Sequence, residues 1–268
     1  MASADARDTF DRLVDIMARL RAPGGCPWDR EQTAESLQPY LVEEAYEVLD
    51  AIADGDPESL RDELGDVLLQ VVFHAEIAAE TGRFGIADVA RAIGDKLVRR
   101  HPHVFGDVTV RDADEVSRNW REIKAAERRA KGIVGGVLSS VPRALPALPR
   151  AQQVGDKLAD VGFDWPDLAG TLAKVDEERQ ELEEAVASGD AAAAARELGD
   201  LLLTMTSVAR HLGVSAEIVL REATERLSHR VAEVESQAAA AGTSLGALDA
   251  TARDRLWEEA KRRTAAKV

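Results

Sequence analysis

The sequence predicts an all-α protein that contains two copies of one helical-bundle domain. Ala, Leu, Glu and Arg, which all favour helices, dominate the 268 residues, and only 4% of the residues are aromatic. The phrase ELGDVLLQ begins at Glu63, and ELGDLLLT begins 134 positions later at Glu197. Alternating apolar residues, which indicate a strand, occur only briefly, in residues 107–110. We therefore expect a tandem repeat of helical domains.

The repeat extends well beyond this one phrase. Blocks of similar sequence occur in the same order in both halves, at offsets of 134, 134, 130 and 137 positions. The small changes in offset indicate short loop insertions within a shared architecture. The matching blocks are residues 42–49 with 176–183, 63–70 with 197–204, 95–101 with 225–231, and 119–124 with 256–261.

A segment rich in Gly, Ser and Pro lies between the two copies, and these residues interrupt helices and favour loops. We expect an N-terminal domain over residues 1–130, a linker over 131–150 and a C-terminal domain over 151–268.

Helices are expected at 5–21, 86–100 and 114–130, with counterparts in the second half. Between the first two of these helices the sequence predicts a helical hairpin. Gly55 ends its first helix, and Asp56 and Pro57 begin its second as N-cap and first residue. Residues 187–190 (ASGD) form the equivalent turn in the second copy. We expect two apolar stripes at helical spacing to be buried against each other: Leu41, Ala45, Val48 and Ile52 on one helix, and Leu60, Leu64, Val67 and Val71 on the other.

Composition and motifs exclude several classes of protein. The formal net charge of −15 disfavours binding to nucleic acid through a basic face. Cys26 is the only cysteine, which excludes an intrachain disulfide and a multi-cysteine zinc site. No apolar run reaches the ~18 residues of a membrane helix, and no secretory signal is present, so we expect a cytoplasmic protein that does not bind membranes. A P-loop motif is absent, and no histidine follows a glutamate at the spacing that di-iron bundles use.

Acidic side chains border the apolar stripes of the predicted hairpin. At about 100° per residue, Glu44 and Glu47 share one edge of the first stripe, and Glu63 and Asp66 share one edge of the second. Antiparallel packing brings these edges together. Converging carboxylates repel one another unless a cation neutralises them, and a hard divalent ion such as Mg²⁺ or Mn²⁺ prefers oxygen ligands. The second copy repeats the arrangement with the same spacing, at Glu178, Glu181, Glu197 and Asp200.

The pattern E-E-x-x-E followed by E-x-x-D resembles the MazG family of all-α nucleoside triphosphate pyrophosphohydrolases, in its two-domain form. Further stretches that resemble the family lie along nearly the whole chain: GGCPWDREQT (24–33), GRF (82–84), DKLVRRHPHVFGD (95–107), NWREIK (119–124), VPRALPAL (141–148) and VGFDW (161–165).

The resemblance implies helical bundles that are completed by dimerisation to a homodimer. It also implies cleavage of nucleoside triphosphates between the α and β phosphates, with broad base tolerance and a role in clearing non-standard nucleotides. It assigns Mg²⁺ binding to Glu44, Glu47, Glu63 and Asp66 in the first copy, and to Glu178, Glu181, Glu197 and Asp200 in the second.

Further residues are candidates for the general base and for substrate binding. Glu43 or Glu177 is the candidate general base, and the choice between them stays open. Arginine forks suit phosphate oxygens, lysines add positive charge, and tryptophans stack on a base or ribose. The candidate substrate-binding residues are Arg100, Trp120 and Lys124, with Arg230, Trp257 and Lys261 as their counterparts.

The sequence leaves open which copy is active. Ala193 stands where the family's C-terminal domains carry a basic residue that contacts substrate. The alternative to an enzyme is a non-catalytic helical interaction module that keeps the fold, although both copies retain all four carboxylates.

Overall fold

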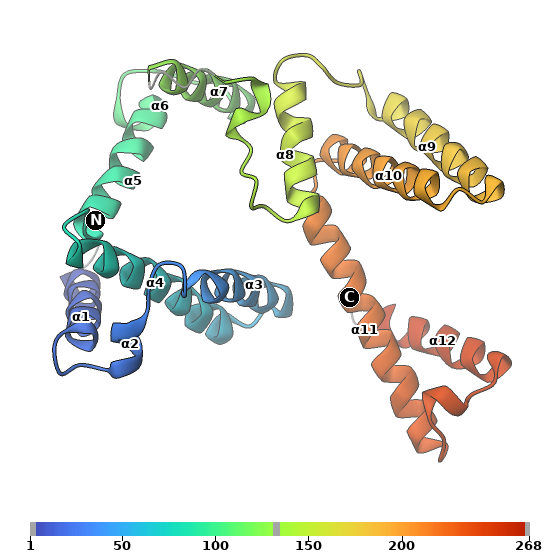
Figure 1. Ribbon diagram of the computed structural model, residues 1–268. Helices are drawn as coiled ribbons and strands as arrows, with labels where there is room; N and C mark the ends of the chain where they lie inside the picture. Colours follow the sequence, from blue (N-terminus) through green and yellow to red (C-terminus); the bar gives the residue numbers. More distant parts are fainter. Residues whose placement is uncertain (1–3, 131–134, 266–268) are drawn as a thin grey trace. The chain divides into compact units, whose positions relative to one another are not determined.

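The computed structural model describes residues 4–130 and 135–265, and within these ranges it contains helices and no strand. The expected all-α fold is confirmed. The chain divides into two compact units, Met1–Ile133 and Val134–Val268 (Figure 1). The expected linker overlaps the second unit, because residues 137–140 form a 3₁₀ helix and the next α-helix begins at Ala147.

The first unit contains α1 (Ala4–Arg21), α2 (Pro27–Glu31), α3 (Gln38–Asp54), α4 (Pro57–Glu80), α5 (Ile86–Arg100), α6 (Pro102–Phe105) and α7 (Ala113–Ala130). The second unit contains η1 (Val137–Ser140), α8 (Ala147–Ala159), α9 (Leu168–Ser188), α10 (Ala191–His211), α11 (Ala216–Ala240), η2 (Leu245–Ala247) and α12 (Ala250–Ala265). In the part of the chain that the structure describes, no helix has the length and apolar character required to cross a bilayer.

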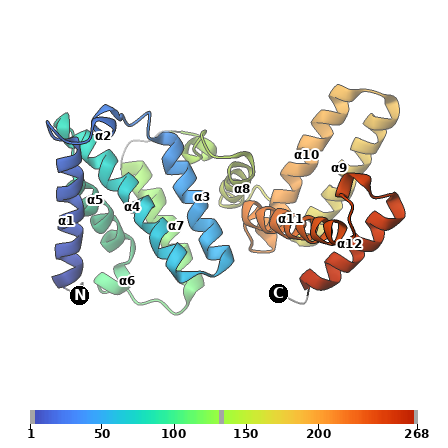
Figure 2. The same cartoon turned by 90° about the horizontal axis from the view of Figure 1, so that it is seen from below.

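An antiparallel helical hairpin is the central feature of each unit (Figures 1 and 2): α3 with α4, and α9 with α10. Gly55 ends α3 with a φ of 69°, in the left-handed region that glycine enters without steric penalty. The Asp56 side chain then accepts a hydrogen bond from the backbone N–H of Glu58 at 3.0 Å and caps α4. Gly189 and Asp190 form the same turn between α9 and α10. The two predicted turns are confirmed.

The cores of the two units differ in side-chain size. In the first unit, α1 packs on α4 around a cluster of large apolar side chains: Met17, Leu37, Val72, Phe73 and Ile77. Small side chains fill most buried positions of the second unit, where α8 packs on α10 and α11 on α12: Thr171, Ala185, Thr204, Thr206, Ser207, Ala209, Ala216, Ala238 and Ala260. Small residues allow close approach of helices but bury little apolar area.

The expectation that the hairpin's apolar stripes are buried is wrong within a single chain. Ile52 is 57% exposed and Leu64 is 51% exposed, and Leu41 and Val71 are also exposed. The hairpin of the second unit has the same property, with Val186 at 63% and Leu202 at 52%. Two antiparallel helices bury only the inner part of each stripe, and no other helix among the described residues covers the outer part of these stripes.

Candidate functional site

The antiparallel hairpin explains which acidic residues meet. Glu44 and Asp66 each lie 11 positions from Gly55 on opposite sides of the turn, and Glu47 and Glu63 each lie 8 positions from it. Residues at equal distances from the turn of an antiparallel pair lie at the same height, and a step of three residues is about one helical turn. The four carboxylates therefore occupy two adjacent levels of the hairpin.

Three of these carboxylates converge in the first unit. One oxygen from each of Glu44, Glu63 and Asp66 lies within 4.8 Å of the others. Glu44 and Glu63 are half-buried, whereas Asp66 is exposed. We call these three residues the first acidic cluster.

The second unit brings together the equivalent residues. Oxygens of Glu178, Glu197 and Asp200 also lie within 4.8 Å of one another, and Glu178 is only 5% exposed. Each residue of this second acidic cluster follows its counterpart by 134 positions. The same geometry thus arises twice from the same local sequence pattern.

Glu47 and Glu181, the remaining predicted ligands, are exposed and lie at the margins of the two clusters. The negative charge of Glu47 acts on both Glu44 and Glu63. Burial, followed by the charge of Glu178, raises the pKa of Glu181. The structure therefore brings three of the four predicted carboxylates together in each unit, with the fourth close enough to act electrostatically on the others.

The first acidic cluster concentrates uncompensated negative charge. Burial raises the pKa of Glu44, and the neighbouring carboxylate of Asp66 adds to the effect. Burial also raises the pKa of Glu63, followed by repulsion from Glu47, Asp66 and Asp62. Burial and repulsion between neighbouring anions both raise the pKa of a carboxylate, and both act here. A bound cation reverses this unfavourable interaction.

Gln70 is a member of the site that sequence reasoning missed. It lies on α4, one helical turn after Asp66, and is 5% exposed. Its amide hydrogen-bonds the carboxylate of Glu44, which favours the ionised form, while its Oε1 is buried without a hydrogen-bond partner. The sequence did contain a signal for Gln70: it follows Asp66 by four residues, and residues at this spacing lie on the same face of a helix. The three carboxylates, with Gln70 beside Glu44, form an oxygen donor set that fits a hard divalent cation such as Mg²⁺.

Lys174 is the second residue that was missed. It lies on α9, one turn before Glu178, and its Nζ is 2.7 Å from Oε1 of Glu177 and 2.7 Å from Oε1 of Glu178. The second acidic cluster therefore contains an internal cation. Glu177, one of the two candidate general bases, is one of its partners, and both Glu177 and Glu43 are exposed.

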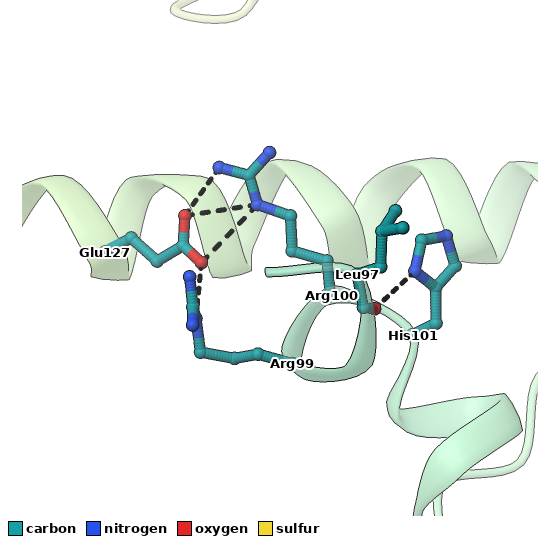
Figure 3. Close-up of polar contacts among 5 residues, drawn as sticks. All are labelled: Leu97, Arg99, Arg100, His101 and Glu127. Atoms are coloured by element: carbon teal, nitrogen blue, oxygen red, sulfur yellow. Dashed lines mark hydrogen bonds and ion pairs between the residues drawn. The ribbon is translucent and has the colours of Figure 1, made fainter. Parts of the chain in front are cut away.

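The predicted substrate-binding residues of the first unit form a separate group on α5 and α7. The guanidinium of Arg100 lies 5.5 Å from the centroid of the Trp120 ring, and Nζ of Lys124 lies 4.3 Å from the same centroid. Arg100 also binds Glu127, with 2.6 Å between Nη2 and Oε2, and Arg99 binds the same carboxylate (Figure 3). The tryptophan lines a pocket with Lys96, Leu97, Arg100, His101 and Val116.

Their counterparts in the second unit are arranged differently. Arg230 donates a hydrogen bond from Nε to Oγ1 of Thr264 at 3.4 Å, and Lys261 forms an ion pair with Glu258. Trp257 lines a pocket that also includes Val231, Val234, Leu245, Arg253 and Asp254. Each tryptophan thus borders a pocket, but the structure records no contact between either group and the acidic cluster of its own unit among the described residues.

Known proteins with similar sequences support the repeated domain and the class of enzyme. The profile of the MazG nucleotide pyrophosphohydrolase domain matches residues 32–105 and 168–234, which include both acidic clusters. The chain is 48% identical over 256 residues to the nucleoside triphosphate pyrophosphohydrolase of Escherichia coli strain K12, covering 94% of this chain and 97% of that protein.

A more distant bacterial relative has a similar length. The chain is 43% identical over 252 residues to the nucleoside triphosphate pyrophosphohydrolase/pyrophosphatase MazG of Thermotoga maritima, covering 94% of this chain and 95% of that protein. These matches confirm the family and the class of enzyme that the motifs predicted. The chain belongs to the MazG family of nucleotide pyrophosphohydrolases and carries the family's domain twice.

Proposed function

We propose that this chain hydrolyses nucleoside triphosphates between the α and β phosphates and releases a nucleoside monophosphate and pyrophosphate. The observation that carries this proposal is the pair of carboxylate clusters, at equivalent positions of two helical hairpins that both match the family's domain. The names of the E. coli and T. maritima relatives agree with it. We further propose Mg²⁺ as the physiological cation, with Mn²⁺ as a substitute.

The acidic clusters fit a cation that also binds phosphate oxygens. Glu44, Glu63 and Asp66 would hold the ion in the first unit, and Glu178, Glu197 and Asp200 in the second, with Glu47 and Glu181 completing each set. A bound Mg²⁺ supplies neutralisation of the triphosphate and lowers the pKa of water near the α phosphorus. Without such an ion, either cluster would repel the negatively charged substrate.

A carboxylate next to each cluster in sequence is the candidate acceptor for the proton of the attacking water. Glu43 and Glu177 each precede a cluster residue directly, and we propose that one of them is the general base. Glu43 is exposed, so its carboxylate is accessible to water. Glu177 must first release Lys174, because that ammonium engages its carboxylate at 2.7 Å.

We assign nucleotide binding to the cation–tryptophan groups. Trp120 with Arg100 and Lys124 provides an aromatic surface beside positive charge, and Trp257 with Arg230 and Lys261 is its counterpart. Stacking on an aromatic ring tolerates every base, because every base has a π face. This supports broad base specificity and a role in removing non-standard nucleotides from the cellular pool.

A homodimer would bring separate parts of the site together. The outer faces of both hairpins expose apolar side chains, with Ile52 at 57% and Val186 at 63%. Exposed apolar stripes on paired helices indicate a helix-packing partner. We propose that a second copy of the chain covers these stripes and completes a four-helix bundle.

Product analysis tests the proposed reaction. The full chain is incubated with Mg²⁺ and each common nucleoside triphosphate, and the products are identified by ³¹P NMR. We expect monophosphate and pyrophosphate in equal amounts. Release of diphosphate and orthophosphate, or no reaction with any nucleotide, contradicts the proposal.

Matched variants then identify the active copy. Glu63→Gln removes a carboxylate from the first acidic cluster, and Glu197→Gln removes the equivalent one from the second. Glu58→Gln on α4 and Glu184→Gln on α9 are controls that remove one exposed carboxylate each, outside the clusters. Loss of activity in one cluster variant, with both controls active, assigns catalysis to that copy.

A further inference from the structure

The second acidic cluster contains a charged residue, Lys174, that has no charged counterpart in the first. Its Nζ lies 2.7 Å from both Glu177 and Glu178, and Glu178 has a side chain that is only 7% exposed. The ammonium group of Lys174 therefore forms an ion pair with Glu178, a carboxylate that belongs to the second acidic cluster.

Among the described residues, no lysine takes the equivalent place in the first acidic cluster. Tyr40 occupies the position of Lys174, 134 residues earlier, and its ring packs edge-on against Trp28 with 6.0 Å between the centroids. After burial, the largest electrostatic influences on Glu44 and Glu63 come from other carboxylates and the neutral amide of Gln70. The same three-carboxylate geometry thus exists once with an internal ammonium and once without it.

We infer that Lys174 is a built-in counter-cation that competes with the divalent ion at the second acidic cluster. The first cluster then binds a divalent cation more tightly than the second when nucleotide is absent. This inference rests on one part of the proposed function, namely that both clusters bind a cation. To bind an ion through Glu178, the protein must first break the ion pair of a largely buried carboxylate and then tolerate repulsion between the two cations.

The charge balance also predicts an order of binding. A triphosphate brings enough negative charge for Lys174 and a divalent ion to remain close together. We therefore expect the second cluster to take up its cation together with nucleotide, whereas the first cluster takes up its cation alone. Lys174 acts through the carboxylates it engages, so it is a positioning residue in this scheme.

Mn²⁺ titration of single-cluster proteins tests the inference. In the full chain, Glu197→Gln with Asp200→Asn leaves only the first cluster, and Glu63→Gln with Asp66→Asn leaves only the second. Free Mn²⁺ is measured by electron paramagnetic resonance without nucleotide. We expect the first cluster to bind Mn²⁺ at least about tenfold more tightly, because the second cluster must first break the ion pairs of Lys174.

Charge exchanges between the two positions complete the test. Lys174→Met should tighten Mn²⁺ binding by the second cluster about tenfold, Lys174→Arg should leave it weak, and Tyr40→Lys should weaken the first cluster by a similar factor. Circular dichroism confirms that each variant is folded, and the Tyr40→Lys arm stands if Lys174→Met does not fold.

The possible outcomes separate this inference from the proposed function. Equal affinities at the two clusters, unchanged within twofold by Lys174→Met and by Tyr40→Lys, overturn the role of Lys174 and leave the cation sites intact. Absence of Mn²⁺ binding to both single-cluster proteins, and to the unmodified chain, overturns the proposed cation sites and this inference together.

Discussion

Arg100 on α5 and Glu127 on α7 form a two-point ion pair, with Nη2 2.6 Å and Nε 3.1 Å from the same carboxylate oxygen, Oε2. Both side chains are 16% exposed. Arg99 adds a further contact, with 2.7 Å between its Nε and Oε1 of Glu127 (Figure 3). Sequence reasoning assigned Arg100 to phosphate, whereas in this structure its guanidinium joins α5 to α7 beside Trp120.

The first prediction concerns the effect of low pH on the stability that the ion pair between Arg100 and Glu127 contributes. The two arginines lower the pKa of Glu127 from 4.5 to about 2. A lowered carboxylate pKa stabilises the folded state above the unfolded-state value, and this stabilisation is lost as pH falls from about 4.5 to about 2. We expect Glu127→Gln to lower the melting temperature by a few degrees at pH 7, with the difference vanishing towards pH 2.

Glu122→Gln is the matched control for this prediction, because Glu122 is an exposed acid on the same helix. Thermal unfolding followed by circular dichroism across this pH range is the measurement. A Glu127→Gln protein that melts with the unmodified chain at pH 7 would show that the ion pair does not stabilise the fold.

The second prediction concerns the cation-free first cluster. Burial and neighbouring carboxylates raise the pKa of Glu63 above 4.5, so its ionised form destabilises the folded state. The penalty is fully present above the folded-state pKa and disappears below about pH 4.5. We expect Glu63→Gln to raise the melting temperature by about 1–3 °C at pH 8 without divalent ions.

Addition of Mg²⁺ should reverse this order, because only the unmodified cluster gains stability from the bound ion. Differential scanning calorimetry at pH 4 and pH 8, with EDTA or with Mg²⁺, measures both effects, and Glu58→Gln is the control. Destabilisation by Glu63→Gln in EDTA at pH 8 would argue against electrostatic strain in the cluster.

The third prediction concerns Gln70. Gln70→Leu removes the hydrogen bond that favours ionised Glu44 and also removes the buried oxygen that has no partner. We expect divalent-ion binding by the first cluster to weaken several-fold while the free energy of unfolding changes by less than about 1 kcal/mol, because loss of an unsatisfied buried group offsets the lost hydrogen bond.

Thr204→Val is the control at the equivalent position, where Thr204 Oγ1 donates only to the backbone oxygen of Asp200, at 2.9 Å. Calorimetric titration with Mn²⁺ and urea unfolding are measured on the same samples. If Gln70→Leu leaves the affinity of the first cluster unchanged, the amide of Gln70 has no part in the site.

The fourth prediction concerns the exposed apolar stripes. Ile52 and Val186 occupy equivalent positions of the two hairpins, and both are more than half exposed. If a second copy covers these faces, Ile52→Asp with Val186→Asp places charges in the interface and should convert a dimer to a monomer. Sedimentation velocity at micromolar concentration reports the change.

Ala53→Asp with Ala187→Asp is the matched control. These residues are exposed, they directly follow the tested pair in sequence, and each lies about 100° further around its helix. We expect this control to remain dimeric. An unmodified chain that sediments as a monomer at tens of micromolar excludes the proposed interface.

The hairpins and their carboxylates were predictable because they depend on local sequence. Gly55 and Asp56 define a turn, and the equal spacing of Glu44 and Asp66 from that turn determines that they meet. The second copy provides an internal check, since the same residues recur at the same separation. Capping chemistry and helical periodicity were therefore sufficient to locate both clusters.

Other features depend on contacts that spacing alone does not determine. The partner of Arg100 is Glu127, 27 residues further along on another helix, and nothing in either local sequence indicates that pairing. Lys174 was overlooked because a lysine one turn from a glutamate is usually a surface ion pair of little consequence. Burial of the stripe containing Ile52 was predicted wrongly because helical periodicity identifies an apolar face without identifying what covers it.

The most direct test of the two proposed cation sites is to locate the bound ion itself. Crystals of the full chain grown with Mn²⁺ and a non-hydrolysable triphosphate analogue, measured at the manganese absorption edge, would show each ion as an anomalous peak. We expect a peak coordinated by Glu44, Glu63 and Asp66, or by Glu178, Glu197 and Asp200, with a phosphate oxygen in the same coordination shell. Nucleotide bound elsewhere, with no peak at either cluster, would contradict it.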